Sequence, residues 1–542
     1  CIRDSSYTGT SSNRANPFVI LSPENTCETS GSCIGCNLIY SGNHYEALEK
    51  DSYGKFRFVA GINPRSFSWQ LAPGEAFYTP EAVLNFSADG FRGLSGQLHS
   101  FIREHIVRGV WKHKPRPVLL NSWEACYFKI DEKKLLQLAK AGKDAGIELF
   151  VMDDGWFLGR NDDTSSLGDW EPDPKKLPGG IASLSKKIKE LGMDFGIWVE
   201  PEMISENSNL YKEHPDWAMK IPGHPHSEGR NQCILDLCNP EVRKYVIEEM
   251  TRIFSSGDIR YAKWDMNRIF SDIYAPSLPA ERQGETAHRY VLGLYQIMEE
   301  LTTRFPKILF EGCSAGGNRF DLGILCYFPQ IWASDNTDAL CRTGIQNSYS
   351  YGYPLSVFTA HVSSCPNHQT LRITPLETRF QVASFGILGY ECNLKDLSGG
   401  DLNAIREQIA LYKKWRDVFQ FGTFYRGTEN EDSDSETLSW TCVSPDGRRA
   451  VGLFFRRLTT PNQSHDWYRP AGLLPDVKYH FYGRNIKYNL KDFGDLVNTV
   501  SPVHIKQGSA LQEILSRFVN MDGEKEDLTA YGDTLMLAGI AL

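Results

Sequence analysis

The chain has 542 residues, which is too long for one ordinary core and indicates two to four domains. Its hydrophobic share of 41% and charged share of 23% are typical of a soluble globular protein. The net charge of −9 argues against nonspecific binding to nucleic acid or to an anionic membrane surface, and no apolar run is long enough for a membrane span.

Residues 1–112 alternate short β-type runs with turns, which predicts an N-terminal β-rich domain, part of a β-sandwich. An amphipathic helix over 93–107 then leads into a proline-containing linker. The sequence opens without an initiator methionine, so we expect this domain to be incomplete. The predicted strands cover residues 18–21, 36–40, 55–60, 67–71 and 82–86.

The 13 cysteines are odd in number and scattered along a large chain. This usage favours reduced thiols and a cytoplasmic location over a disulfide framework. Cys33 and Cys36, with Cys27 nearby, have the spacing of half a zinc site. No second pair follows at a matching distance, so we expect no metal there.

Residues 113–425 change to apolar strands that alternate with helices, which predicts a parallel sheet buried on both faces. Six strand–helix units are visible, and two weaker strands are predicted at 355–362 and 380–388. Eight units make a (β/α)₈ TIM barrel the expected α/β fold, with an open doubly wound sheet as the alternative. The six clear strands cover 118–121, 149–152, 195–199, 261–265, 308–310 and 330–332.

Residues 426–542 return to β-type runs after a predicted helix at 404–419. Runs at 438–443, 450–456 and 479–482 predict a small C-terminal β-sandwich domain.

Polar side chains follow nearly every predicted barrel strand, at the end where a barrel carries its chemistry. The set contains carboxylates and tryptophans together, which suggests glycoside chemistry, because retaining hydrolysis needs two carboxyl groups about 5–5.5 Å apart. Its members are Trp123, Asp153, Asp154, Trp198, Glu200, Lys263, Asp265, Cys313, Trp332 and Asp335.

Two of these carboxylates have the surroundings of a nucleophile and of an acid/base. Lys263 and Asp265 are two apart on one strand and point to the same face, so the ammonium should keep Asp265 ionised. Asp335 has no neighbouring base and can more easily hold a proton, although Asp338 competes for that role. Asp153 and Asp154 would bind hydroxyl groups through charge-assisted hydrogen bonds.

Five motifs then carry a specific resemblance. They are Asn-Ser-Trp-Glu at 121–124, Met-Asp-Asp-Gly-Trp at 152–156, Lys-Trp-Asp-Met-Asn-Arg at 263–268, Glu-Gly-Cys-Ser at 311–314 and Trp-Ala-Ser-Asp-Asn-Thr-Asp at 332–338. In order and spacing they resemble glycoside hydrolase family 36, which consists mainly of retaining α-galactosidases. The resemblance runs through the whole chain.

The resemblance implies that Asp265 is the nucleophile and Asp335 the acid/base. Asp153 and Asp154 would bind the 4- and 6-hydroxyls of galactose. The remaining implied contacts are Trp123, Trp198 and Trp332 lining the pocket, Arg230 and Lys263 as donors, and Cys313 and Gly316 facing the 2-position. It implies a terminal α-galactoside as substrate, a homo-oligomer, and neither metal nor cofactor.

Other interpretations stay open at this point. The run 313–318 departs from the usual glycine-rich pattern, so an α-N-acetylgalactosaminidase or galactosaminidase is an alternative. A lysine inside a barrel strand would also suit a Schiff-base aldolase that uses Lys263. A third alternative is a sugar-binding scaffold without catalysis. The balance between hydrolysis and transglycosylation is not readable from the residues.

Overall fold

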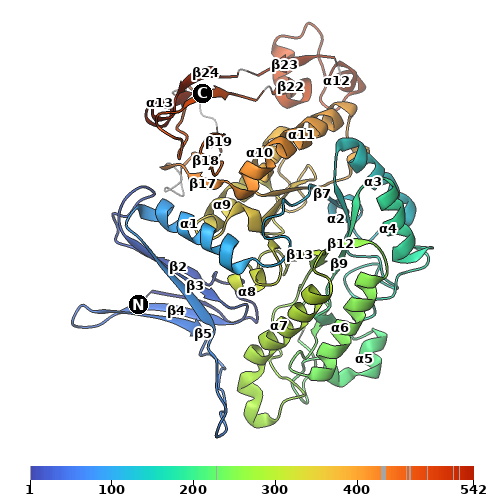
Figure 1. Cartoon of the computed structure of the whole chain (residues 1–542). Coiled ribbons are helices and arrows are strands. Elements are labelled where there is room, and N and C mark those ends of the chain that lie inside the picture. The colour runs from blue at the N-terminus through green and yellow to red at the C-terminus, as the bar shows by residue number, and fades with distance from the viewer. Residues whose placement is uncertain are drawn as a thin grey trace.

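A computed structural model describes residues 2–227, 229–428, 435–458, 461–462, 466–484, 486–516, 518–523 and 525–542. Antiparallel N-terminal sheets, a central α/β barrel and antiparallel C-terminal sheets follow one another along the chain (Figure 1). The expected fold class is therefore confirmed. The domain limits at 112/113 and 425/426 stay predictions.

Eight parallel strands close the central barrel in chain order, with the last paired to the first. Nearly all of their residues are buried, which is why they appear in the sequence as apolar runs rather than alternating ones. The strands are β7 Leu119–Asn121, β8 Leu149–Met152, β9 Asp194–Val199, β12 Ile259–Trp264, β13 Leu309–Gly312, β14 Gln330–Trp332, β15 Phe358–Ser363 and β16 Ile387–Glu391.

The two weaker strand predictions were partly wrong in position. Residues Leu355–Val357 form a 3₁₀ turn before β15, and most of 380–388 belongs to helix α10 Leu376–Ser384, so that β16 begins later than predicted. Phe380 and Val382 are buried on that helix. A short apolar run does not distinguish a buried strand from the buried face of a helix.

Helices surround the barrel (Figure 1). Two of them are α3 Glu132–Ala145 and α7 Thr286–Arg304. The Asp131 side chain caps the start of α3, and Gly146 ends it with a left-handed backbone that glycine adopts without strain. The others are α2 Trp123–Cys126, α4 Gly180–Glu190, α5 Asn209–Glu213, α6 Pro240–Ser255, α8 Leu322–Leu325, α9 Ala339–Tyr349 and α11 Gly399–Phe421. Between β9 and α6 lies the short antiparallel pair β10 Met203–Ile204 and β11 Cys233–Ile234.

The N-terminal region consists of two three-stranded sheets and one helix. Helix α1 Gly90–Phe101 packs against β3 and β6 and continues as a π-helical turn, Ile102–Ile106. The predicted strand at 67–71 was wrong, because those residues form no regular element, and β1 and β4 were not predicted. The sheets are β1 Ile2–Ser6, β4 His44–Lys50 and β5 Phe56–Ile62, and β2 Phe18–Leu21, β3 Cys33–Ile39 and β6 Glu81–Ser87.

The C-terminal region is also antiparallel, and its first strand is tied to the N-terminal region. Arg426 at the end of β17 forms a fully buried ion pair with Glu28 at 2.6 Å. The elements are β17 Thr423–Arg426, β18 Thr437–Val443, β19 Ala450–Arg456, β20 Trp467–Tyr468, β21 Lys478–Tyr482, β22 Lys487–Asn489, α12 Ala510–Leu515, β23 Asn520–Asp522, β24 Asp527–Tyr531, α13 Gly532–Ala538 and β25 Ile540–Ala541.

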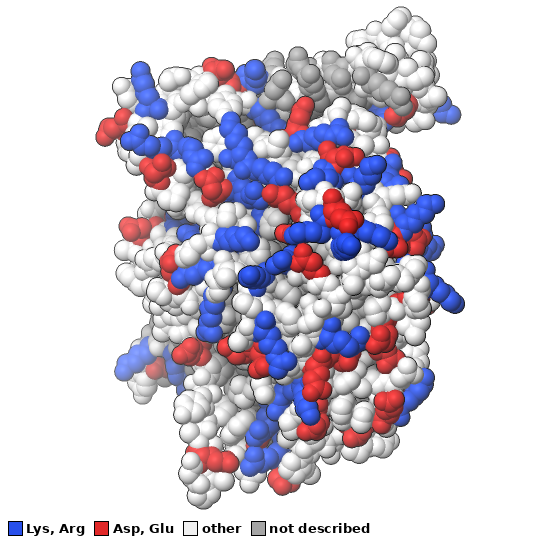
Figure 2. All heavy atoms as spheres, turned by 45° about the vertical axis from the view of Figure 1, so that its right-hand side comes forward, with Lys and Arg blue, Asp and Glu red and all other residues white. Residues whose placement is uncertain are grey.

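The surface carries mixed charge. Figure 2 shows Lys and Arg interspersed with Asp and Glu over the side of the molecule where α3, α4 and α6 lie. None of the helices in the described part of the chain has the length and apolar character needed to cross a membrane.

Candidate active site

The carboxyl ends of the barrel strands bring most of the predicted residues to one end of the barrel. Asp153 directly follows β8, Asp265 follows β12 and Cys313 follows β13, while Asp335 lies three residues beyond β14. In parallel barrels this end holds the chemistry, because eight loops converge there on a rigid frame.

Asp265 is a buried carboxylate surrounded by hydrogen-bond donors. Its Oδ2 accepts from the indole Nε1 of Trp198 at 3.1 Å and from the amide of Asn267 at 2.9 Å, and its Oδ1 accepts from the backbone N–H of Met266 at 2.9 Å. Burial alone would raise the pKa of Asp265, but the charge of Lys263 and the donors around the carboxylate hold that pKa below its usual value. Asp265 is therefore ionised near neutral pH.

Lys263 forms its direct ion pair with a different carboxylate from the one that follows it on the strand. Its Nζ lies 3.1 Å from Oδ2 of Asp153, which also accepts from the amide of Asn121 at 2.7 Å. Burial would lower the pKa of Lys263, but Asp153 and the other acidic groups around it raise that pKa well above its usual value. The lysine is thus a fixed cation shared between Asp153 and Asp265.

Asp335 lies at the mouth of the barrel, where part of its surface is open to solvent although protein surrounds its carboxyl group, and its pKa shifts in the opposite direction to that of Asp265. Desolvation and the nearby charge of Asp265 raise its pKa, while Lys263 and the indole of Trp332, which donates to Oδ1 at 2.8 Å, only partly oppose this. The two carboxyl groups therefore have pKa values that are shifted apart. Such a pair can work with one carboxyl group ionised, here Asp265, and the other protonated, here Asp335.

Gly316 fits closely under the backbone of this acid. It has a φ of +85°, and a Cβ atom at this position would lie 2.8 Å from the backbone nitrogen of Asp335. Only glycine fits there without moving the loop that carries Asp335. The Cys313 thiol is buried and is one of the groups that hold the pKa of Asp265 below its usual value.

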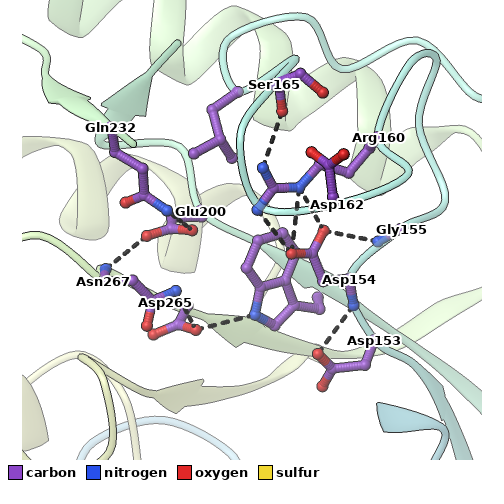
Figure 3. A network of polar contacts seen from close by, with 12 residues as sticks. Asp153, Asp154, Gly155, Arg160, Asp162, Ser165, Glu200, Gln232, Asp265 and Asn267 are labelled. Atoms are coloured by element: carbon purple, nitrogen blue, oxygen red, sulfur yellow. Dashed lines mark hydrogen bonds and ion pairs between the residues drawn. The ribbon is translucent and has the colours of Figure 1, made fainter. Parts of the chain in front are cut away.

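Asp154 forms an ion pair with Arg160, a residue that the sequence analysis did not single out. Arg160 donates to both of its carboxylate oxygens, through Nε at 3.0 Å and Nη2 at 2.8 Å, and both side chains are buried (Figure 3). Burial raises the pKa of Asp154, although Arg160 opposes the rise. Arg160 lies in a loop with no strand or motif pattern to mark it.

Replacing Arg160 with methionine is expected to lower the free energy of unfolding by about 3–5 kcal/mol, because Asp154 would remain buried without its counter-charge. The exposed pair of Arg304 and Glu300, 2.8 Å apart, provides a matched control: Arg304→Met should cost under about 1 kcal/mol. Urea unfolding of both variants measures the difference. Equal losses would contradict this account of the buried pair.

Three further buried titratable groups, Glu200, His361 and Glu391, lie on or directly after the barrel strands. Glu200, directly after β9, accepts from the backbone of Asn267 at 2.5 Å, and burial together with the charge of Asp265 raises its pKa to about 8 (Figure 3). Glu391 at the end of β16 is hydrogen-bonded to His361 at 2.8 Å. Burial raises the pKa of Glu391 to about 8 and lowers that of His361 to about 3, so this pair carries no net charge near neutral pH.

The aromatic and cationic members of the predicted set lie at different depths. Trp198 and Trp332 are buried, and the ring of Trp332 lies tilted against that of His361, with 4.4 Å between the ring centroids. Trp123, on α2, is half-buried against the edges of two aromatic neighbours. Arg230 is exposed, and its charge acts on the pKa of Asp335, which places it toward the same mouth.

Asp338 has a structural role that accounts for its carboxylate. It caps α9 by accepting from the backbone N–H groups of Leu340 and Cys341, and it pairs with Arg372 at 2.6 Å. These three contacts go to its Oδ1, and its Oδ2 accepts from the hydroxyl of Thr370 at 2.5 Å. Both oxygens of Asp338 are therefore engaged, which leaves Asp335 as the carboxyl group available at the mouth. Cys33 and Cys36 are both buried on β3, and Cys33 donates to the carbonyl of Gly90.

Comparison with protein families gives matches over most of the chain. The Melibiase family model matches residues 76–422. The model of the glycosyl hydrolase family 36 N-terminal domain matches 2–72, and that of the corresponding C-terminal domain matches 437–542. Three models thus follow one another in the order of the N-terminal sheets, the barrel and the C-terminal sheets.

Curated and solved relatives agree with these matches. The chain is 46% identical over 481 residues to alpha-galactosidase AgaA of Geobacillus stearothermophilus and 47% identical over 475 residues to alpha-galactosidase Mel36A of Lactobacillus acidophilus. These alignments cover 89% and 88% of this chain but only 66% and 64% of the relatives, so the chain spans just under two thirds of their length. The AgaA crystal structure superposes with a TM-score of 0.89 at 42% identity, over 100% of this chain and 69% of that one. Variants of AgaA have been solved with raffinose and with stachyose.

Proposed function

Because this chain belongs to the melibiase family, glycosyl hydrolase family 36, we propose that it is a retaining, exo-acting α-galactosidase that removes terminal α-D-galactose from oligosaccharides or glycoconjugates. The observation that carries the proposal is the pair Asp265 and Asp335, whose pKa values are shifted in opposite directions at one barrel mouth. Raffinose and stachyose, which are bound by variants of a similar enzyme, are the first substrates to test.

In this mechanism the ionised Asp265 attacks the anomeric carbon and forms a covalent glycosyl-enzyme, while protonated Asp335 gives its proton to the departing glycosidic oxygen. Asp335, now a carboxylate, then removes a proton from water, and that water displaces Asp265. Two inversions give net retention of the α-configuration. The donors around Asp265 favour its charged form and so favour its release as a leaving group in the second step.

The sugar hydroxyls would donate hydrogen bonds to two buried carboxylates, Asp153 and Asp154, which are held in place by neighbouring side chains. Asp153, oriented by Lys263 and Asn121, and Asp154, oriented by Arg160, keep lone pairs for the 4- and 6-hydroxyls of galactose. Trp123, Trp198 and Trp332 would line the pocket, with Arg230 at its rim. Rigid carboxylates that accept hydrogen bonds from sugar hydroxyls discriminate strongly against a sugar that lacks the matching hydroxyl.

The geometry does not favour an aldolase. A Schiff-base lysine must lose its proton to become a nucleophile, so its pKa is usually lowered. The pKa of Lys263 is instead raised, and its Nζ lies 3.1 Å from the Asp153 carboxylate.

The choice between galactose and a 2-substituted sugar depends on the loop that carries Cys313 and Gly316. A panel of p-nitrophenyl α-glycosides of galactose, N-acetylgalactosamine, galactosamine and glucose tests it. We expect kcat/KM for the galactoside to exceed that for the glucoside by at least about 10³-fold, because the axial 4-hydroxyl is read by buried carboxylates. If the N-acetylgalactosaminide is cleaved faster than the galactoside, the protein is an α-N-acetylgalactosaminidase instead.

Trp198→Phe is expected to move the acidic limb of the kcat/KM profile to higher pH by about one to two units. Its indole donates to Asp265, and losing one hydrogen bond to a charged group costs about 1.5–3 kcal/mol, which raises the pKa of that carboxyl. Trp440→Phe is the matched control, since that buried indole donates to Asn347. A limb that stays in place in Trp198→Phe, or moves equally in the control, would contradict this role.

A further inference from the structure

A second group of polar side chains lies beside the short pair β10 and β11, outside the carboxylates already described. Glu206 follows β10, Cys233 begins β11, and His226 lies in the connection between them. One carboxylate oxygen, one imidazole nitrogen and the thiol sulfur all lie within 4.8 Å of one another. The pairing of Ile204 with Cys233 brings the two ends of this connection together, so tertiary structure forms a cluster that no sequence motif indicates.

These three side chains are the ligand types that zinc prefers. Zinc–ligand bonds of about 2.0–2.3 Å place the ligands of a tetrahedral ion roughly 3.3–3.8 Å apart. His226 Nε2 already lies 3.7 Å from Glu206 Oε1. No separation in the cluster needs to close by more than about 1 Å to reach that range. The Glu206 side chain is exposed. Three protein ligands leave a fourth position for water.

The surroundings of His226 also match those of a metal ligand. Its other ring nitrogen, Nδ1, faces Asp272 Oδ2 at 3.8 Å, as ligating histidines usually face a carboxylate through the nitrogen that does not bind the metal. Asp272 is itself held by the backbone N–H and the hydroxyl of Ser227, at 2.9 and 2.7 Å. Lys220 and Arg268 are the cations nearby, and they balance part of this negative charge.

We propose that Glu206, His226 and Cys233 bind one divalent transition-metal ion, with Zn²⁺ as the preferred cation. Nε2 of His226, Sγ of Cys233 and one oxygen of Glu206 are the ligands, and Asp272 orients the imidazole. The Tyr211 hydroxyl, 3.3 Å from Nε2, gives up that contact when the cation binds. Cys233 binds as a thiolate, and its proton passes to solvent.

The position of the site gives the cation a structural effect. Arg230 lies in the chain between two of the ligands, His226 and Cys233, so a bound ion would fix the segment that carries this residue. That consequence for the sugar site rests on the proposed function, whereas cation binding does not. The test therefore measures binding and not hydrolysis.

Co²⁺ is the probe, because a thiolate bound to cobalt gives a charge-transfer band and a four-coordinate site gives strong visible bands. After dialysis of the full chain against EDTA, we expect one equivalent of Co²⁺ to produce both features and one equivalent of Zn²⁺ to abolish them. Cys233→Ser should remove the charge-transfer band. Glu206→Gln should weaken Zn²⁺ binding, measured by competition with cobalt, at least about tenfold, as should Asp272→Asn.

Cys365→Ser is the matched control, because Cys365 is an exposed free cysteine outside the cluster, and it should leave the spectrum unchanged. Thermal melting without metal checks that each variant folds. Glu206 is exposed, so its substitution decides the matter even if Cys233→Ser is unstable. The proposal is overturned if wild type gives no charge-transfer band, if Cys365→Ser removes it, or if Glu206→Gln binds Zn²⁺ as tightly as wild type.

Discussion

Asp265→Ala is expected to lower kcat for p-nitrophenyl α-galactoside by at least about 10⁴-fold. The variant loses the carboxylate that we propose as the nucleophile, while the donors from Trp198 and Asn267 stay in place. Stopped assays with high enzyme concentration measure the residual rate. Circular dichroism and melting show whether the fold is kept.

External azide distinguishes loss of the nucleophile from general damage to the site. In Asp265→Ala, azide can occupy the vacated space on the β-face of the sugar, so we expect partial recovery of rate and β-galactosyl azide as the product. Asp162→Ala is a suitable control, since Asp162 is exposed and accepts from Thr164. The nucleophile assignment fails if Asp265→Ala keeps near wild-type activity, or if wild type first releases the β-anomer of galactose.

Asp335→Ala is expected to lower kcat/KM for raffinose by about 10²–10⁴-fold, the contribution of a positioned general acid. The loss should be smaller with p-nitrophenyl α-galactoside, because p-nitrophenolate leaves with little help from a proton. Comparison of the two substrates in one variant therefore separates proton donation from sugar binding.

The pH profile supplies a second test of Asp335. Wild type should lose activity at low pH as Asp265 gains a proton, at a pKa below the usual value, and at high pH as Asp335 loses one, at a pKa above it. Asp335→Ala should flatten only the alkaline limb. Asp338→Ala, which removes a helix cap, should lower the melting temperature but keep both limbs. If Asp338→Ala loses the alkaline limb instead, the acid/base assignment is wrong.

The sequence predicted the barrel well because its strands are buried on both faces and its helices have clear ends. The cap at Asp131 and the left-handed Gly146 mark the limits of α3 in the residues themselves. The eighth strand was placed too early, since the apolar residues of α10 have no helical signature over so short a length. Strands β1 and β4 were missed because polar and charged residues interrupt their alternation.

The site could be predicted only where strand ends carry chemically distinctive residues. Asp153, Asp265 and Asp335 follow strands, so parallel pairing alone brings them to one end. The ion pair of Lys263 with Asp153 crosses between strands that are not neighbours, β8 and β12, and period-two alternation within one strand cannot reveal it. Arg160 was missed for a related reason: its loop returns to Asp154 through tertiary packing.

The buried pair of Glu28 and Arg426 links the N-terminal region to the first strand of the C-terminal region. Arg426 also donates to the carbonyl of Ser350 and to Ser95, and its guanidinium stacks 3.7 Å from the ring of Tyr351. A version of this protein cut before β17 would leave the Glu28 carboxylate inside the N-terminal region without a counter-charge, at a cost of about 3–5 kcal/mol. The barrel therefore cannot be excised or exchanged by itself without loss of stability, because the regions before and after it are joined by this one buried ion pair.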